Sequence, residues 1–184
     1  MRRCPLVTII FAPNTQVDIS ANTYTRAEFI KLEGEVCCAL EFRLSGVTCA
    51  PFLQHFLVVA DANPKQVSLA WYLAELGLLD YKLVGVKASE YAAAVVHLTR
   101  QTLLPQNSPA TGSSSAVWTD SLRHYTHYTP SELVETVILL HGCQKRAWEG
   151  KYAAVRNRYA QPEKLHVSDY VTCLQDNFLR FSND

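Results

Sequence analysis

Four side chains in the C-terminal half have the chemistry of metal ligands: His124, His127, His141 and Cys143. Imidazole nitrogens and thiolate sulfur are the ligands that tetrahedral zinc sites use. The spacing does not favour such a site, because His124 and His127 share a face of one short helix whereas the other two residues belong to a later helix. Ordinary surface histidines explain the same pattern, so we predict no metal centre and no cofactor.

Nucleophilic catalysis needs a Cys or Ser beside a base in a cleft. The sequence contains no nucleophile elbow, glycine-rich turn or phosphate-binding loop. Cys37 and Cys38 are consecutive, so one helix face does not present both thiols to a metal ion. We therefore predict that the chain is not an enzyme and takes no small-molecule substrate.

A basic group near the C-terminal end consists of Lys145, Arg146, Lys151, Arg156 and Arg158. Nucleic-acid surfaces interleave such charges with aromatic side chains on which bases stack. We find no such stacking platform, predict that the chain binds no nucleic acid, and interpret the basic group as a solvated face. The 17 Lys and Arg residues cancel the 17 Asp and Glu residues, so no global field attracts nucleic acid or an acidic membrane.

The length and composition limit the classes of protein to which the chain can belong. A chain of 184 residues with 48% hydrophobic residues can bury one ordinary core, or one domain plus a fragment, and is not disordered throughout. Its six cysteines show no CxxC pair and no spacing of a secreted domain, which favours reduced thiols in the cytosol or nucleus. Residues 1–12 have the outline of a secretory signal but no cleavage site follows, so we expect an irregular or strand-like leader.

Two apolar helical segments meet at a short break within residues 69–103. The stripe of the first segment is Leu69, Leu73, Leu76 and Leu79, and that of the second includes Tyr91, Val95 and Leu98 among alanines. Each segment is shorter than the roughly 20 apolar residues of a membrane span. The charged residues Asp80, Lys82 and Lys87 lie between them. We predict a buried helical hairpin that does not cross a membrane.

Thr25 begins the helix with the clearest start, because Thr25 and Glu28 have the spacing of a capping box and Tyr24 can pack against Phe29. We expect this helix to end near Phe42. Further helices are predicted at residues 50–62, 65–79, 87–103, 118–128, 130–145 and 152–159. Pro, Ser and Gly residues favour an exposed loop at 104–117. No strand alternation is present, so the predicted class is all-α.

Two polar side chains fall on the apolar faces of these helices. An unpaired buried carboxylate costs several kcal/mol, so we predict that Glu75 pairs with a helix terminus or a cation, with Arg100 as one candidate. His97 lies on a mainly apolar helix. We interpret His97 as a core histidine rather than a metal ligand or a pH switch.

The segments FLQHFLVVAD, YLAELGLLDY, AAAVVHLTRQTL and WTDSLRHYTHYTPSEL follow one another in the order and spacing of the second cyclin box of mitotic, A- or B-type cyclins. Residues 46–167 resemble that complete C-terminal box, and residues 22–45 resemble the last helix of the first box. Residues 1–21 form an unmatched leader and residues 168–184 a tail. The resemblance implies a five-helix bundle preceded by one helix of an incomplete N-terminal box.

Cyclins hold a mobile helix of a cyclin-dependent kinase in its active position and are not enzymes. The resemblance therefore implies a regulatory subunit that binds a cyclin-dependent serine/threonine kinase and regulates cell-cycle progression, in the nucleus and cytoplasm. The helices that bear the family's substrate-docking patch and kinase-binding lysine have no counterpart in this sequence, so we expect impaired kinase binding. The alternative is a cyclin-fold scaffold that binds another protein without activating a kinase.

Four residues match positions at which the family contacts its kinase: Glu33, Cys37, Phe42 and Leu44. The resemblance assigns Glu33 to the kinase backbone and the other three to apolar contacts, with Cys37 replacing a larger leucine. A solvated helix charge for Glu33, and core packing for Phe42 and Leu44, are the alternatives. Without sister helices, we expect the apolar stripe of this helix to face water, with residues 1–12 covering part of it.

Overall fold

The computed structural model describes residues 17–44, 46–103 and 117–170. The chain divides into two compact units, Met1–Gly46 and Val47–Asp184. Regular structure in the described residues is entirely helical, which confirms the all-α prediction. The predictions for a leader at 1–12 and for most of the loop at 104–117 fall outside the described residues.

Helix α2, Arg26–Ala39, is the main element of the first unit. The backbone N–H of Thr25 donates to Glu28 Oε2 at 2.7 Å, and the backbone N–H of Glu28 donates to Thr25 Oγ1 at 3.4 Å. The rings of Tyr24 and Phe29 lie 5.8 Å apart and meet edge to face. The predicted capping box and staple are therefore confirmed, although the helix ends at Ala39 rather than near Phe42.

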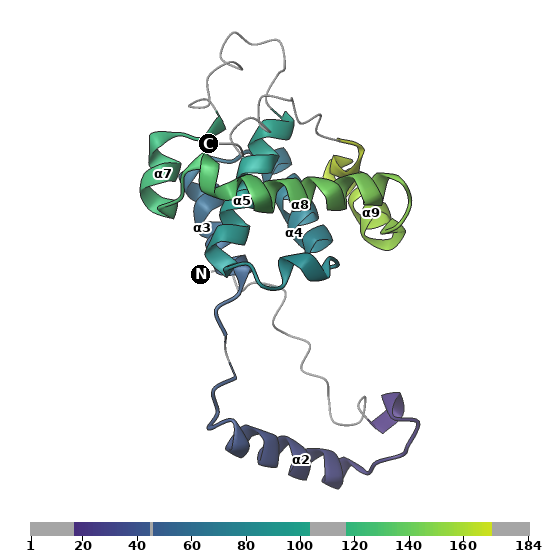
Figure 1. Ribbon diagram of the computed structural model, residues 1–184. Helices are drawn as coiled ribbons and strands as arrows, with labels where there is room; N and C mark the ends of the chain where they lie inside the picture. The colour runs from purple at the N-terminus through teal and green to yellow at the C-terminus, as the bar shows by residue number, and fades with distance from the viewer. Residues whose placement is uncertain (1–16, 45, 104–116, 171–184) are drawn as a thin grey trace. The chain divides into compact units, whose positions relative to one another are not determined.

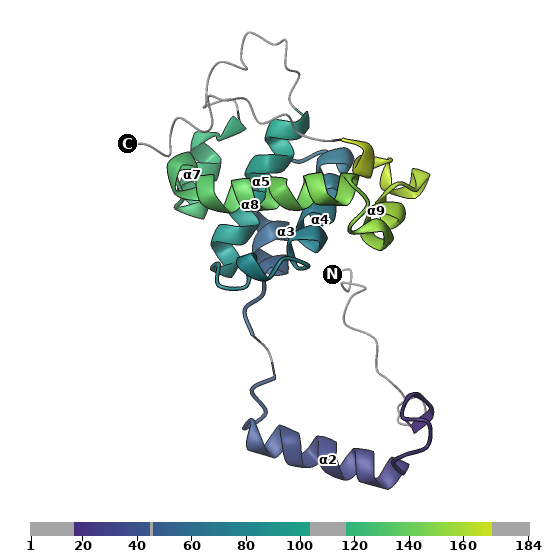
Figure 2. The same ribbon diagram turned by 45° about the vertical axis from the view of Figure 1, so that its right-hand side comes forward.

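Helix α5, Ala88–Leu103, lies at the centre of the second unit. It contacts α3, Cys49–Val59, α4, Pro64–Gly77, and α8, Pro130–Trp148 (Figure 1, Figure 2). Every residue from Tyr91 to Thr99 is buried. Small alanine side chains let the neighbouring helices approach α5 closely, so the predicted burial of this segment is confirmed.

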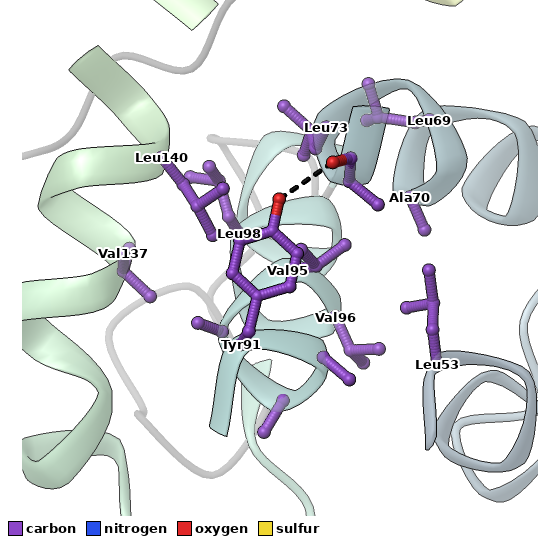
Figure 3. Close-up of a cluster of buried hydrophobic side chains, with 14 of the residues drawn as sticks. Leu53, Leu69, Ala70, Leu73, Tyr91, Val95, Val96, Leu98, Val137 and Leu140 are labelled. Carbon is purple, nitrogen blue, oxygen red and sulfur yellow. Dashed lines mark hydrogen bonds between the residues drawn. The ribbon is translucent and has the colours of Figure 1, made fainter. Parts of the chain in front are cut away.

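Helices α4 and α5 meet where Gly77 faces Tyr91. The Tyr91 hydroxyl donates to the backbone carbonyl of Ala74 at 2.7 Å, inside a core that includes Leu98 and Leu140 (Figure 3). A Cβ atom at Gly77 would lie 2.0 Å from Tyr91 Oη. Glycine therefore provides the space that the buried phenol occupies.

The break between the two central helices differs from the prediction. Asn63 caps α4, since its Oδ1 accepts from the backbone N–H of Gln66 at 2.9 Å. Helix α4 ends at Gly77, and a short 3₁₀ helix, η1, Tyr81–Leu83, follows. Leu79 lies in the turn between them and is 49% exposed, so its assignment to the buried stripe was wrong. The helical spacing that relates it to Leu76 does not continue past the end of α4.

The remaining elements close the second unit. They are the helices α7 (Asp120–Thr126) and α9 (Ala153–Tyr159) and the 3₁₀ helices η3 (Pro162–Lys164) and η4 (Val167–Asp169). Helix α8 also belongs to this group and extends to Trp148, beyond its predicted end. Thr129 is the N-cap residue of α8, and its backbone N–H donates to Glu132 Oε2 at 2.7 Å. The segment after α9 returns to α4, where Ser68 Oγ donates to the carbonyl of Lys164 at 2.9 Å.

Glu75 has a different partner from the one considered in the sequence. Arg158 Nη1 donates to its Oε2 at 3.0 Å, and the Tyr159 hydroxyl donates to its Oε1 at 2.7 Å. Arg100 instead donates to the backbone carbonyls of Val117 at 2.7 Å and Ala60 at 3.1 Å. Of the two expected kinds of partner, a helix terminus or a cation, the structure shows a cation. Arg100 was the wrong candidate, since it joins the C-terminal end of α5 to the backbone at Val117 and Ala60.

His97 is buried in the core, as predicted. Its ring centroid lies 5.5 Å from that of Trp118. Burial, together with the nearby charge of Arg100, lowers the pKa of His97 to about 4. The imidazole is therefore neutral at physiological pH and packs as an aromatic side chain.

Candidate functional site

The four predicted contact residues lie within α2 and the turn that ends it. The backbone N–H of Phe42 donates to the carbonyl of Cys37 at 2.8 Å, and that of Glu41 donates to the carbonyl of Cys38 at 3.0 Å. These two bonds form a Schellman turn, with Leu40 as the C-cap. The turn brings the backbone of Phe42 beside the carbonyl of Cys37.

This turn has an unusual backbone for its sequence. Glu41 has φ 50° and Phe42 has φ 56°, in the left-handed region where glycine is preferred. The left-handed conformation costs an L-residue roughly 1–2 kcal/mol. Such local strain is found more often at functional sites than elsewhere. Because neither residue is glycine, no ordinary C-cap signal marks the end of α2 in the sequence, which explains the error in its predicted boundary.

Two further contacts hold the segment after α2. Arg43 Nη2 lies 3.0 Å from Glu41 Oε2, in an exposed ion pair that contributes little to stability. The backbone N–H of Leu44 donates to the carbonyl of Phe42 at 2.9 Å. Backbone hydrogen bonds thus connect Cys37 to Phe42 and Phe42 to Leu44.

The apolar members of this group are open to solvent. Phe42 is 69% exposed and Leu44 is 61% exposed, so neither packs in a core of the first unit. Cys37 is half-buried. The alternative of core packing for Phe42 and Leu44 is therefore wrong within the first unit. We define the kinase-contact candidates Glu33, Cys37, Phe42 and Leu44 as the α2-end surface.

Glu33 lies one helical turn before Cys37, on the same face of α2. Its side chain is exposed, and no ion pair joins it to another residue in the described segments. Helix α2 has no buried residue, and its large aliphatic side chains are exposed at Ile30, Leu32, Val36 and Leu40. This agrees with the expectation that its stripe faces water.

The four candidate metal ligands lie on two different helices of the second unit. His124 and His127 have ring centroids 6.4 Å apart on α7 and its C-cap, whereas His141 and Cys143 lie on α8. Among the described residues, no three potential ligands gather in a geometry that would hold a metal ion. Cys143 is buried, with Sγ 3.5 Å from Asp80 Oδ2. Burial raises the pKa of the Cys143 thiol to about 11, so it stays protonated and is a poor nucleophile at neutral pH.

The basic group has aromatic neighbours that the sequence interpretation missed. The Arg156 guanidinium lies 4.4 Å from the centroid of the Trp148 ring, and Lys151 Nζ lies 5.8 Å from that of Tyr152. The interpretation of this group as lacking interleaved aromatics was therefore wrong. The signal was present in the sequence, since Trp148 and Tyr152 alternate with the basic residues between positions 145 and 158.

Residues 47–172 match the family described as the C-terminal domain of cyclins. The chain belongs to the cyclin family. It is 37% identical over 155 residues to cyclin-A2-2 of Arabidopsis thaliana, covering 82% of this chain and 34% of that relative. It is 30% identical over 152 residues to putative cyclin-B3-1 of the same plant, covering 83% and 36%. The predicted resemblance to A- and B-type cyclins is confirmed.

A G2/mitotic-specific cyclin of Daucus carota, C13-1, is 36% identical over 157 residues, which cover 83% of this chain and 43% of that relative. This cyclin chain thus spans between about a third and somewhat over two fifths of the length of each curated relative named above. In the segments that the structure describes, no helix combines the length and the apolar character needed to span a membrane.

Proposed function

We propose that this chain is a cyclin-type regulatory subunit that binds a cyclin-dependent protein kinase through the α2-end surface. It regulates cell-cycle progression without catalysing a reaction itself and works in the nucleus and cytoplasm. Residues 22–45 provide the last helix of a first cyclin box, and residues 46–167 provide the C-terminal box. The observation that carries this proposal is the exposed Phe42, held beside Cys37 by the Schellman turn.

The α2-end surface suits a protein partner for two reasons. Burying one exposed side chain the size of Phe42 or Leu44 contributes roughly 1.5–3 kcal/mol. Glu33, one turn away, offers a carboxylate that can accept hydrogen bonds from backbone N–H groups of the kinase, and such charge-assisted bonds are stronger than neutral ones. The surface combines an apolar anchor with a directional polar contact, but it is small, so we expect modest affinity.

A capture assay tests the proposal. The full chain is immobilised and titrated with a purified cyclin-dependent kinase. Phe42→Ala should weaken capture by about tenfold or more, from the lost apolar burial. Glu33→Ala should weaken it as well. The matched controls are Glu35→Ala, the same charge change on the same helix, and Val58→Ala, an exposed apolar side chain on α3.

The controls should leave capture unchanged. Capture that is as strong with Glu33→Ala and Phe42→Ala as with the unmodified chain would refute the α2-end surface. A kinase that is not captured at all would refute the proposed function itself.

A second candidate function follows from the exposed aliphatic side chains of α2. Ile30, Leu32, Val36 and Leu40 are all solvent exposed, and together they offer a helix for a partner that need not be a kinase. In that case the chain acts as a cyclin-fold scaffold. Kinase activity measured in the same capture assay separates the two functions, because a scaffold leaves phosphorylation of a peptide substrate at the level of the kinase alone.

A further inference from the structure

Positive charge is concentrated in one short part of this neutral chain. Residues 145–164 contain six Lys or Arg residues and two Glu residues, a net charge of +4, although the whole chain has net charge 0. These residues form the C-terminal end of α8, the whole of α9 and η3 (Figure 1). The remaining 164 positions therefore have a net charge of −4, so the asymmetry is local.

Two of the six cations have acidic partners within the second unit. Arg146 pairs with Asp80, and Arg158 Nη1 lies 3.0 Å from Glu75 Oε2. In residues 17–44, 46–103 and 117–170, Lys145, Lys151 and Arg156 form no such ion pair. Their charge is available to a partner.

One of these three cations stacks on an exposed aromatic side chain, and the other two lie within three residues of that side chain in the sequence. Trp148 is 48% exposed, and the Arg156 guanidinium stacks 4.4 Å from its ring centroid. Lys145 lies three residues before Trp148 and is its neighbour on α8. A guanidinium that stacks on a ring keeps its N–H edge free for a carboxylate. We call Lys145, Trp148, Lys151 and Arg156 the α8–α9 corner.

The backbone holds this corner in one geometry. The N–H of Gly150 donates to the carbonyl of Ala147 at 3.2 Å, and that of Lys151 donates to the carbonyl of Arg146 at 3.0 Å. This is a second Schellman turn, and Gly150, with φ 97°, occupies its left-handed position. A fixed turn limits the conformational entropy that a partner must overcome on binding.

We propose that the α8–α9 corner binds an acidic peptide segment of a partner protein. Carboxylates of the segment contact Arg156 and the two lysines, and an apolar side chain of the segment packs on Trp148. Tryptophan and arginine at the centre of a site are the residues that most often dominate protein–protein affinity. This surface lies outside the α2-end surface, so the proposal goes beyond the kinase contact.

A peptide fits the corner better than a nucleic acid does. Nucleic-acid affinity comes mainly from Lys and Arg side chains that neutralise several phosphates along the strand. The corner offers Lys145, Lys151 and Arg156 only, and Glu149 lies among them. Three cations and one exposed indole match a few carboxylates and one apolar side chain.

Fluorescence anisotropy with the full chain tests this proposal. The probe is a fluorescein-labelled peptide, Glu-Glu-Phe-Glu-Glu-Leu-Glu-Glu, and its counterpart with Gln at every Glu position is the uncharged control. The acidic peptide should bind, and the uncharged peptide should bind about tenfold more weakly or not at all. Raising the salt concentration should weaken binding, because the corner is exposed and screened.

Charge-reversal variants locate the binding surface. Arg156→Glu, and separately Lys145→Glu combined with Lys151→Glu, should each reduce affinity by about tenfold or more. The lysine pair is exposed and has no ion pair in the described residues, so that variant tests the surface even if Arg156→Glu disturbs folding. Lys87→Glu, an exposed lysine before α5, is the matched control and should bind normally.

Indole resonances give a second, direct readout. In a ¹H–¹⁵N spectrum, Trp148→Phe identifies the Trp148 indole signal, which the acidic peptide should shift while the signal of buried Trp118 stays in place. Equal binding of both peptides, or equal loss with Lys87→Glu, would overturn the proposal. So would tighter binding of a single-stranded eight-nucleotide thymidine oligomer than of the acidic peptide, since that result assigns the corner to nucleic acid.

Discussion

Replacing Gly77 by alanine perturbs the closest approach between α4 and α5. The added Cβ atom would lie 2.0 Å from Tyr91 Oη and 2.8 Å from Leu140 Cδ2. Alanine favours a helix over glycine by about 0.8–1.0 kcal/mol, which alone would stabilise the fold. Overpacking a core costs typically 1–3 kcal/mol, and displacing the Tyr91 hydroxyl from the Ala74 carbonyl costs roughly another 0.5–1.5 kcal/mol. The net expectation is a loss of about 1–3 kcal/mol.

Urea denaturation of the full chain, followed by circular dichroism, measures this loss as a lower midpoint at unchanged slope. Gly142→Ala in α8 is the matched control. Its Cβ would meet only the flexible end of Arg146, with Nη1 at 3.3 Å. We expect that variant to be neutral or up to about 1 kcal/mol more stable.

A double-mutant cycle with Tyr91→Phe tests the stated cause. Removing Oη removes the nearest obstacle, so Gly77→Ala should cost less in the Phe background than in the unmodified chain. If Gly77→Ala were as stable as the unmodified protein, or if its cost were the same with Phe at position 91, steric conflict with the phenol would not be the reason for glycine at this position.

Three further predictions follow from the core and from the scattered ligands. Leu98→Ala should destabilise the fold by roughly 2–5 kcal/mol, because it leaves a cavity in the core, and a loss below about 0.5 kcal/mol in urea denaturation would contradict this. His97 has a folded pKa of about 4, below its ordinary value of 6.5, so its neutral form stabilises the fold above pH 6.5 and that contribution is lost as the pH falls toward 4. The contribution of neutral His97 to the free energy of unfolding amounts to roughly 3 kcal/mol. Between pH 6.5 and 4, the urea midpoint should therefore fall less in His97→Phe than in the unmodified chain. An equal fall in both proteins would disprove the assignment. Elemental analysis of the purified protein should find zinc well below one equivalent, and a tightly held equimolar metal would overturn the prediction of no metal centre.

Local signals in the sequence were sufficient to locate most helices. The capping boxes Thr25–Glu28 and Thr129–Glu132 depend on residues three positions apart, so their hydrogen bonds form wherever the helix forms. The burial of α5 could also be predicted, because a helix with apolar and small side chains almost all round is stable only inside a protein. The order and spacing of four sequence segments were enough to identify the family.

The candidate site was predicted in part. The family resemblance selected Glu33, Cys37, Phe42 and Leu44, but it could not place them relative to one another. The left-handed conformations of Glu41 and Phe42 bring Cys37 and Phe42 together, and no residue preference predicts them because neither residue is glycine. Whether Phe42 was exposed or packed also required the structure, since an aromatic side chain suits either environment.

Contacts between residues distant in sequence were decided by the tertiary structure alone. Glu75 pairs with Arg158 and Tyr159, because α9 packs against α4. Arg100, in the last turn of α5, instead donates to the backbone carbonyl of Val117. The necessity for glycine at position 77 likewise depends on the Tyr91 hydroxyl, which reaches it from another helix. A sequence specifies local hydrogen bonds and apolar faces directly, whereas the partner that a polar or small residue meets depends on how whole helices pack.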